Sequence, residues 1–356
     1  MMGELRLMKG NEAVAEAAIR CGCDAYFGYP ITPQSEILEY LMSEKPHERT
    51  GMVVLQAESE IAAINMVYGA ASTGKKVMTS SSSPGISLKQ EGISYIAGAE
   101  LPCLIVNVVR GGPGLGTIQP SQADYFQSTK GGGHGDYRLI VLAPASVQEM
   151  SDFVKLAFEL AFKYRNPAMI LSDGVIGQMM EKVELFDPVP RVSEFDQSWA
   201  TTGKTPNRER NIITSLNLDP LLQEEHNHHL QEKYRRMKAE VRYEEISCSD
   251  AEYILVAYGS SARISQKAIE LARAKGIRAG LLRPITLFPF PEEVIGRYAQ
   301  HVKGFLSVEM SAGQMVEDVR LAVNGKVRVE HYGRYGGIVH SPEEVLQALE
   351  EKLVNS

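Results

Sequence analysis

The sequence is poor in the residues that build extracellular or cluster-bearing proteins. It has four cysteines in 356 residues, at positions 21, 23, 103 and 248, and no two of them form a C-x-x-C pair. A cluster of the ferredoxin type needs four correctly spaced thiolates, so this chain cannot carry one by that pattern. We expect buried free thiols and a reducing, cytoplasmic setting, with a Cys21–Cys23 redox pair as the less favoured alternative.

Long apolar runs and an excess of positive charge are missing too. No run reaches the roughly 18 apolar residues that suggest a membrane span, and residues 1–22 are too charged for a signal peptide. A formal net charge of −7 without a basic stripe argues against a nucleic-acid partner. The chain is 44% hydrophobic and 23% charged, which is ordinary for a soluble globular protein, and its 356 residues favour two domains.

Several familiar catalytic motifs are also absent. There is no G-x-x-x-x-G-K-[ST], no H-E-x-x-H and no G-x-S-x-G, which disfavours the enzyme classes that depend on them. "GGPGLG" at 111–116 is followed by loop residues instead of a helix start, so it does not fit a dinucleotide fingerprint. His226, His228 and His229 could bind a metal, but a solvated helix face is the better interpretation, and we expect no metal ligands in this chain.

What is present is a regular alternation of strand-like and helix-like segments over residues 7–185. Short apolar runs such as "AYFGY", "KVMTS", "CLIVNVV" and "PAMILS" alternate with segments of helical spacing. Ser146 and Glu149 form an S-x-x-E capping box for a helix predicted over 147–164. The pattern predicts an α/β fold with a parallel sheet that helices cover on both faces.

The alternation stops near residue 185 and resumes at 251. We therefore predict a first domain at 1–185, a polar connecting excursion at 186–250 and a smaller α/β domain at 251–356. The excursion contains a charged helix with one apolar stripe, made of Leu230, Tyr234, Met237 and Val241. Because these residues follow helical spacing, the stripe is expected to pack against another surface, such as a partner.

A turn with two prolines, "GYPITPQSE" at 28–36, joins a predicted strand to a predicted helix. Thr32 followed by Pro33 is a good helix start, because threonine caps and proline has no amide to leave unpaired. Pro30 rigidifies the approach. Beyond capping, the turn would hold the Thr32 hydroxyl over the carboxyl end of a parallel strand, where open α/β sheets bind ligands.

Two further charged groups follow strands toward the same edge. Glu58 and Glu60 come just after the strand "MVVL", and Glu60 leads a helix almost without charge, so burial of its carboxylate would suit it for proton sharing. Arg110 ends "CLIVNVV" and could grip a carboxylate with two hydrogen bonds. "TSSSSPGIS" at 79–87 is another junction, either an anion site or simple capping. A hydroxyl, a carboxylate and an arginine on one rim predict a site for a small acid.

Three stretches make the sequence resemble a known family: "YFGYPITPQSEILEYL", "QAESEIAAINMVYGAASTGKKVMTSSSSPGISL" and "LRPITLFPFP". They are similar to the alpha subunits of 2-oxoacid:ferredoxin oxidoreductases, and the likeness covers nearly the whole chain. "SSSSPGISLKQEGISYIAGAELP" and "RGGPGLG" are most like members that act on 2-oxoisovalerate. The resemblance implies a thiamine-diphosphate-type pyrimidine-binding domain followed by a smaller transketolase C-terminal-like domain. It also implies conversion of a branched-chain 2-oxoacid to acyl-CoA, carbon dioxide and reduced ferredoxin.

The resemblance also implies roles for single residues. Glu60 matches the glutamate that hydrogen-bonds the aminopyrimidine ring of thiamine diphosphate and so promotes loss of the thiazolium proton; Glu58 is the less favoured candidate. Thr32 and Arg110 match residues that contact the substrate, with Arg110 holding the 2-oxoacid carboxylate. Two further residues are expected beside the cofactor, Pro30 and Ser83.

The family likeness implies that this chain holds half of a cofactor site. No G-D-G motif for magnesium and diphosphate occurs, and "GDY" at 135–137 and "SDG" at 172–174 are poor substitutes. A beta subunit is therefore expected to bind Mg²⁺ and the diphosphate, and the iron–sulfur clusters are expected on that subunit and on a ferredoxin-like delta subunit. A gamma subunit is expected as a separate chain, because this one starts almost at the pyrimidine domain. Coenzyme A would be the co-substrate and ferredoxin the electron acceptor.

Two alternatives stay open. The substrate could be 2-oxoglutarate, whose second carboxylate needs a second cation, and Lys130, His134 and Arg138 follow Arg110 in the chain. The chain could also be a non-catalytic scaffold that only positions the beta subunit.

Overall fold

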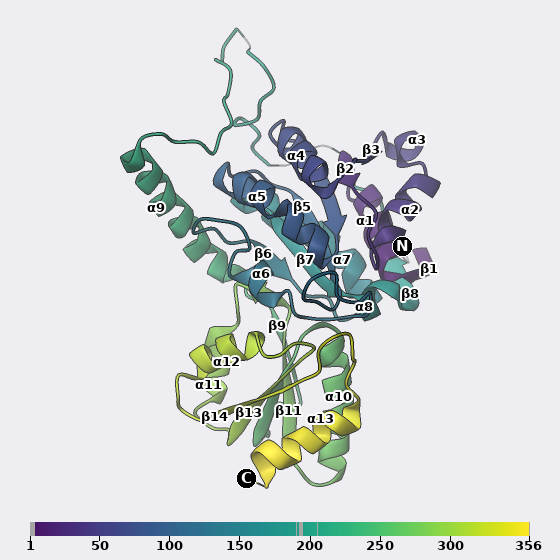
Figure 1. Ribbon diagram of the computed structural model, residues 1–356, viewed down its shortest axis with the longest axis vertical. Coiled ribbons are helices and arrows are strands. Elements are labelled where there is room, and N and C mark those ends of the chain that lie inside the picture. The colour runs from purple at the N-terminus through teal and green to yellow at the C-terminus, as the bar shows by residue number, and fades with distance from the viewer. Residues whose placement is uncertain (1–3, 190, 192–194, 205, 356) are drawn as a thin grey trace.

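The computed structural model describes residues 4–189, 191, 195–204 and 206–355 of the chain. Two α/β units lie end to end along the longest axis of the molecule (Figure 1). None of the helices in the described ranges combines the length and apolar character that crossing a membrane requires. The cysteines at positions 21, 23, 103 and 248 are all free and buried, which confirms the prediction of buried thiols.

The larger unit is built on a seven-stranded sheet. Its strands run in the order β12 (Thr286–Phe288), β6 (Ile140–Leu142), β7 (Ala168–Asp173), β5 (Leu104–Val109), β4 (Val77–Ser81), β2 (Ala25–Gly28) and β3 (Val53–Gln56). All neighbours pair in parallel except β12 and β6. Strands β4, β5 and β7 are buried along their whole length, as expected for parallel strands with both faces covered. The predicted α/β fold is confirmed.

Helices cover the two faces of this sheet in two groups. They are α1 (Gly10–Arg20), α2 (Ser35–Ser43), α3 (Pro46–Thr50), α4 (Glu60–Ala71), α5 (Ser83–Gly98), α6 (Tyr125–Thr129), α7 (Val147–Tyr164) and α8 (Gly174–Gln178). Helix α1 packs against α2 and α7, whereas α4 packs against α5. Right-handed crossovers explain the grouping, because the chain moves one way across the sheet through α4 and α5 and the other way through α2 and α7.

The smaller unit has a five-stranded sheet of its own. The strand order is β14 (Arg328–Gly333), β13 (Gly304–Glu309), β10 (Tyr253–Val256), β11 (Ala279–Pro284) and β9 (Tyr243–Ile246). The helices are α10 (Gly259–Ala274), α11 (Glu292–Tyr298), α12 (Met315–Val323) and α13 (Pro342–Leu349), followed by a π-helical turn at Glu350–Val354. Strand β9 precedes residue 251, and β12 crosses to the larger sheet. The division of the chain at residues 185 and 250 remains a prediction.

Two helix starts show how far the capping patterns hold. At α13 the Ser341 hydroxyl accepts from the Glu344 amide and the Glu344 carboxylate accepts from the Ser341 amide, which completes the box. At α7 the predicted box is only half formed. The Ser146 hydroxyl accepts from the Glu149 amide, but the Glu149 carboxylate accepts from Ala145 N and pairs with Arg283 at 2.6 Å. The ion pair, which joins the two units, takes the carboxylate that a local box would use.

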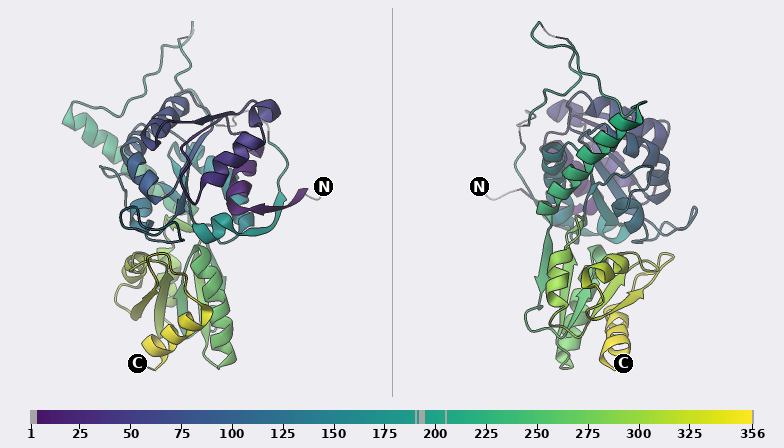
Figure 2. Two further views of the ribbon diagram at one scale, coloured as in Figure 1. Left: turned by 45° about the vertical axis from the view of Figure 1, so that its right-hand side comes forward. Right: turned by 90° about the vertical axis from the view of Figure 1, so that its left-hand side faces the viewer.

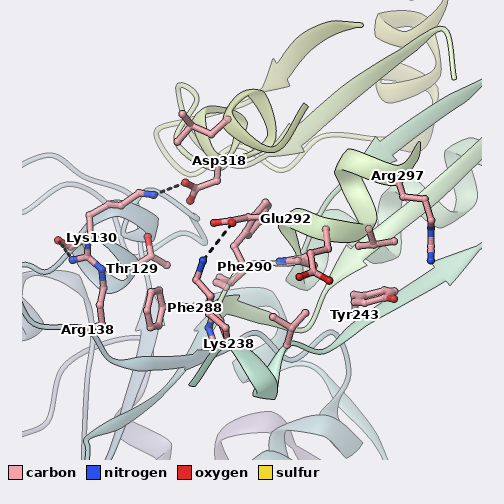
Figure 3. Close-up of a pocket in the computed structure, with 17 residues that line it drawn as sticks. Thr129, Lys130, Arg138, Lys238, Tyr243, Phe288, Phe290, Glu292, Arg297 and Asp318 are labelled. Atoms are coloured by element: carbon pink, nitrogen blue, oxygen red, sulfur yellow. Dashed lines mark hydrogen bonds and ion pairs between the residues drawn. The ribbon is translucent and has the colours of Figure 1, made fainter. Parts of the chain in front are cut away.

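A cavity of about 520 Å³ marks the junction of the two units, and Figure 3 shows the side chains around it. Lys130 forms an ion pair with Asp318, and Lys238 lies 3.7 Å from the carboxylate of Glu292. Deeper in the junction, Gln122 Nε2 donates to the carbonyl of Tyr258 at 2.8 Å. These contacts, together with the β12–β6 pair, fix the smaller unit against the larger one.

Outside the two larger sheets, β1 (Glu4–Lys9) pairs antiparallel with β8 (Met180–Leu185), and the connecting excursion carries α9 (Pro220–Met237). The helix lies across the larger unit (right view of Figure 2). Its apolar stripe is buried there at Leu230, Tyr234 and Met237, and Lys233 Nζ donates to Glu100 Oε1 at 3.0 Å. The stripe therefore packs on its own chain instead of a partner. Val241 does not extend it, because the helix ends at Met237 and a 3₁₀ turn follows at Lys238–Glu240.

The contact between α4 and α5 depends on a helical glycine. A β-carbon added at Gly92 would lie 2.5 Å from Ile64 Cγ2, so we expect Gly92→Ala to lower the free energy of unfolding by about 1–3 kcal/mol. Gly69, in α4, is the matched control because its β-carbon would meet open space, and Gly69→Ala should stabilise by up to about 1 kcal/mol. Chemical denaturation of the purified chain measures both, and equal stability of the two variants would contradict this packing.

Candidate functional site

Four neighbouring parallel strands, β3, β2, β4 and β5, end at one edge of the larger sheet. The chain leaving each strand at this edge carries one of the predicted site residues: Glu60 after β3, Thr32 after β2, Ser83 after β4 and Arg110 after β5. Carboxyl ends of parallel strands are where open α/β sheets form ligand crevices. The topology thus brings the predicted residues to one rim.

The proline-rich turn is formed differently from the prediction. Helix α2 starts at Ser35 with Gln34 in the capping position, so Thr32 is not its N-cap. The Thr32–Pro33 peptide is cis, and Thr32 and Pro30 are both exposed. The Thr32 carbonyl accepts from Arg110 at 3.1 Å, so the backbone of Thr32, and not its hydroxyl, makes the contact with the arginine.

A buried polar network lies beneath this turn. The Ser80 hydroxyl of β4 is bonded to the Tyr26 hydroxyl of β2 at 2.7 Å and to the side-chain oxygen of Gln34. The Gln34 amide in turn donates to the Tyr29 carbonyl at 3.1 Å. A β-carbon at Gly28 would lie 2.2 Å from the Tyr26 hydroxyl, so the glycine makes room for the network. These bonds hold the turn to the sheet from below.

Glu60 and Glu58 differ sharply in environment. Glu60 is the first residue of α4 and is 7% exposed, whereas Glu58 is exposed. The Ser59 hydroxyl caps the helix by accepting from the Ala62 amide. The cap therefore does not occupy the Glu60 carboxylate, which faces Gly85 at the start of α5. A β-carbon on Gly85 would come within 2.7 Å of Glu60 Oε1.

The surroundings of Glu60 fit the aminopyrimidine side of thiamine diphosphate. Gly85 keeps the space beside the carboxylate free of a side chain. The hydroxyls of Ser81 and Ser82 are buried and have no hydrogen-bond partner within the described part of the chain. Buried polar groups are nearly always paired, and the Ser81 hydroxyl lies against the same Gly85 gap as Glu60, which is consistent with a polar ligand there.

Arg110 and Ser83 form the second half of the rim. Arg110 donates from its two terminal nitrogens to the carbonyls of Thr32 at 3.1 Å and Leu115 at 3.0 Å. Its Nε is buried without a partner among the described residues. The Ser83 hydroxyl accepts from the backbone amide of Arg110 at 3.1 Å, which ties the start of α5 to the end of β5. The guanidinium is thus held at the rim by carbonyl groups.

Asp124 belongs to this half of the site, and the sequence analysis did not predict it. Its carboxylate accepts from the Ser83 hydroxyl at 2.8 Å and from the Asn107 amide at 2.9 Å. Burial raises the pKa of Asp124 above its ordinary value, although these two hydrogen bonds act in the opposite direction. Asp124 follows a loop of irregular structure, so no helical or strand periodicity placed it near Ser83. A short polar run after glycines was the only signal.

Other candidates lie elsewhere. Lys130 and Arg138 line the junction cavity of Figure 3, and His134 packs edge-on against Tyr95. Asp173 caps α8 by accepting from Val175 N and Ile176 N, which commits the "SDG" carboxylate to structure.

Two of the three clustered histidines also have structural partners. His226 is bonded to the Gly98 carbonyl and His229 to Glu100. Within the described residues, no group of three possible ligands that could hold a metal ion occurs.

Comparison with known proteins identifies the family. Residues 16–246 match the family described as pyruvate flavodoxin/ferredoxin oxidoreductase, thiamine diphosphate-binding, and residues 251–345 match pyruvate:ferredoxin oxidoreductase core domain II. The chain therefore belongs to this family, as an alpha-type subunit of the 2-oxoacid:ferredoxin oxidoreductases. It is 55% identical, over 97% of both chains, to the ketoisovalerate oxidoreductase subunit VorB of Methanothermobacter thermautotrophicus.

Solved structures agree with this assignment. A 2-oxoglutarate:ferredoxin oxidoreductase from Magnetococcus marinus, with 2-oxoglutarate, coenzyme A and succinyl-CoA bound, matches 98% of this chain with a TM-score of 0.87 and 28% identity. The chain spans 65% of that longer chain. A split-gene transketolase matches with a TM-score of 0.61 at 14% identity, which shows a shared fold. The fold is thus of the thiamine-diphosphate type that the sequence predicted.

The bridge from α5 to β5 can be tested with two serines one turn apart. Ser83→Ala would leave the Arg110 amide and the Asp124 carboxylate each short of a partner, so we expect a loss of about 1–3 kcal/mol in unfolding free energy. Ser87→Ala removes an exposed hydroxyl from the same helix and should change stability by less than about 0.5 kcal/mol. Thermal unfolding of the two variants at matched pH decides. A Ser83→Ala chain as stable as the Ser87→Ala chain would contradict the bridge.

Proposed function

We propose that this chain supplies the aminopyrimidine side of a thiamine diphosphate site in a branched-chain 2-oxoacid:ferredoxin oxidoreductase. The complex would convert 2-oxoisovalerate and coenzyme A to acyl-CoA and carbon dioxide and pass the electrons to ferredoxin. The observation that carries the proposal is the buried Glu60 carboxylate, which faces the Gly85 gap at the carboxyl edge of the sheet. The 55% identity to a ketoisovalerate oxidoreductase subunit supports the choice of substrate.

Glu60 would act as the proton-handling group. When bound, thiamine diphosphate supplies a carbanion that adds to the keto carbon and accepts the electrons of decarboxylation. The carboxylate of Glu60 is the group on this chain that can exchange a proton with a ring nitrogen placed in the gap, because it is buried and is not used by the helix cap. The unpaired Ser81 hydroxyl lies against the same gap, and Pro30 and Ser83 would border the cofactor.

Arg110 would hold the carboxylate of the 2-oxoacid. It now donates to two carbonyls at the rim, and a carboxylate is a stronger acceptor for a guanidinium than a carbonyl is. The unpaired Nε gives it a further donor. Thr32, exposed on the same rim, would offer its hydroxyl to the substrate. These contacts would orient the acid and leave its keto carbon free to react.

The rest of the machinery would come from partner subunits in the cytoplasm. We infer a beta subunit that binds Mg²⁺ and the diphosphate, with iron–sulfur clusters on beta and on a ferredoxin-like delta subunit, and a gamma subunit. Large apolar side chains are exposed on α4 and on β3, at Ile61, Met66, Val53 and Leu55. Exposed apolar side chains grouped beside a half-site are consistent with a covering subunit.

A second candidate substrate is 2-oxoglutarate. The Magnetococcus marinus enzyme of the same fold has 2-oxoglutarate bound, which supports 2-oxoglutarate as the alternative substrate. A second carboxylate would need a second cation near Arg110, and Lys130 and Arg138 line the junction cavity instead. The branched-chain acid, which carries one carboxylate, agrees better with this arrangement.

The glutamate assignment can be tested with two neighbouring carboxylates. In the assembled complex, Glu60→Gln should lower kcat by about 10²- to 10⁴-fold, because the amide cannot exchange the proton. Glu58→Gln alters an exposed carboxylate two residues away and should leave kcat unchanged. Full turnover by an assembled Glu60→Gln complex would reject the catalytic role and favour the scaffold alternative.

The arginine assignment has its own test. We expect Arg110→Met to lower kcat/KM for the 2-oxoacid by about 10²- to 10³-fold, since the charged partner of the substrate carboxylate is lost. Arg138→Met removes an arginine from the junction cavity and serves as the control for a lost cation. Steady-state kinetics with 2-oxoisovalerate distinguish the two. If Arg138→Met lowers kcat/KM for 2-oxoglutarate more than Arg110→Met does, the result would favour 2-oxoglutarate as the substrate.

A further inference from the structure

A lysine is buried beneath the proposed site. Lys89, in α5, has no exposed surface, which is rare for a lysine unless a carboxylate is paired with it. Its Nζ donates to Thr79 Oγ1 at 2.6 Å and to the Ser80 carbonyl at 3.0 Å, both in β4. Among the described residues, these two oxygens are the hydrogen-bond partners of Nζ. Lys89 is therefore a buried amino group whose hydrogen-bond partners are neutral oxygens.

The position of Lys89 connects it to Glu60. Lys89 follows Gly85 by four residues, so both lie on one face of α5, and Gly85 is the residue whose missing side chain makes room for the Glu60 carboxylate. Burial lowers the pKa of Lys89 to about 7, and the negative charge of Glu60 acts in the opposite direction. The attraction between the Glu60 carboxylate and the Lys89 ammonium acts on both groups equally.

Lys89 is also connected to the proline-rich turn. The Ser80 residue whose carbonyl it contacts carries the hydroxyl that bonds to Tyr26 and Gln34. Lys89 thus contacts Thr79 and Ser80 of β4 directly and is influenced by the charge of Glu60 in α4. Tyr26 of β2 is connected to it through the Ser80 hydroxyl. Of these, Glu60 is the carboxylate and Tyr26 the other titratable group.

We propose that Lys89 is a positioning residue of this site, which stabilises the ionised carboxylate of Glu60 and anchors the end of β4 beneath the turn that carries Thr32. The proposal rests on the proposed function for the role of Glu60, but the coupling between the two side chains exists in the chain alone. Lys89 touches neither substrate nor cofactor and acts only through other residues.

The coupling is measurable in the purified chain without cofactor. A lysine with a lowered pKa in the folded state binds fewer protons there than in the unfolded state, so it makes folding more favourable as the pH rises from about 7 toward its ordinary value of 10.5. Over that window the unfolding constant of the wild type should fall about tenfold per pH unit relative to Lys89→Met. In Glu60→Gln this gain in stability with pH should begin about one pH unit lower, because the carboxylate that favours the charged form of Lys89 is gone.

Denaturation curves from pH 6 to 10 for the wild type, Glu60→Gln, Lys89→Met and the double variant give this comparison. The comparison of the wild type with Glu60→Gln needs no change at Lys89, so it remains possible if Lys89→Met does not fold. In that case Lys89→Gln, which can still donate to Thr79, replaces Lys89→Met. The same pH dependence of the unfolding free energy in the wild type and in Glu60→Gln would overturn the coupling.

The assembled complex supplies the second readout. We expect the acid limb of the kcat/KM profile against pH to move in Lys89→Met, because the positive charge that the proposal places behind Glu60 is lost. Thr79→Val removes a hydrogen bond of Lys89 but keeps the charge, so the limb should stay in place. Equal loss of activity in both variants with unmoved limbs would make Lys89 merely structural. Full turnover by Glu60→Gln would contradict the proposed function. The coupling between Lys89 and Glu60 is tested independently by the denaturation curves of the free chain.

Discussion

The site depends on the close approach of helix α5 to the carboxylate of Glu60. A β-carbon on Gly85 would lie 2.1 Å from the Ser81 hydroxyl and 2.7 Å from Glu60 Oε1, so the first turn of α5 can lie there only because that residue is glycine. The start of the same helix is tied to the end of β5 through Ser83 and Arg110. One helix terminus therefore sets both the space beside the carboxylate and the place of the arginine.

Beneath this rim, the sheet carries polar groups where parallel strands are normally apolar. Thr79, Ser80 and Ser81 of β4 are fully buried, as are Tyr26 of β2 and Lys89 of α5. Burying so many polar groups is costly unless they are paired, and most of them are. The hydrogen bonds from Ser80 through Gln34 to Tyr29 explain why a turn with two prolines is held rigidly above the sheet. Such rigid support would suit the small-acid site that we propose.

Much of the architecture follows from local patterns. The helix over 147–164 has the predicted limits, and the apolar runs around Val77, Leu104 and Ala168 are strands of one parallel sheet. Tertiary contacts account for what differs. Glu149 leaves its local cap to pair with Arg283, 134 residues away in the chain. Strand β12 joins the larger sheet although it lies in the chain between β11 and β13 of the smaller one. Such pairings have no signature in a window of neighbouring residues.

The same distinction applies to the site. The placement of Glu60, Thr32, Ser83 and Arg110 on one rim was predictable, because each follows a recognisable strand and parallel strands bring their ends together. Lys89 was hidden because a lysine in a helix normally faces water, and only the packing of α5 on β4 buries it. Asp124 was hidden because it lies in irregular chain. Buried polar side chains of this kind follow from three-dimensional packing instead of sequence spacing.

The central claim is that this rim serves the oxidative decarboxylation of a branched-chain 2-oxoacid. The most direct measurement is viologen reduction by the complex purified from its native cells through a tag on this chain, with a panel of 2-oxoacids, with and without coenzyme A. The account predicts fastest turnover on 2-oxoisovalerate and dependence on coenzyme A. A preference for 2-oxoglutarate would contradict the assigned substrate, and a complex without activity on any 2-oxoacid would contradict the function.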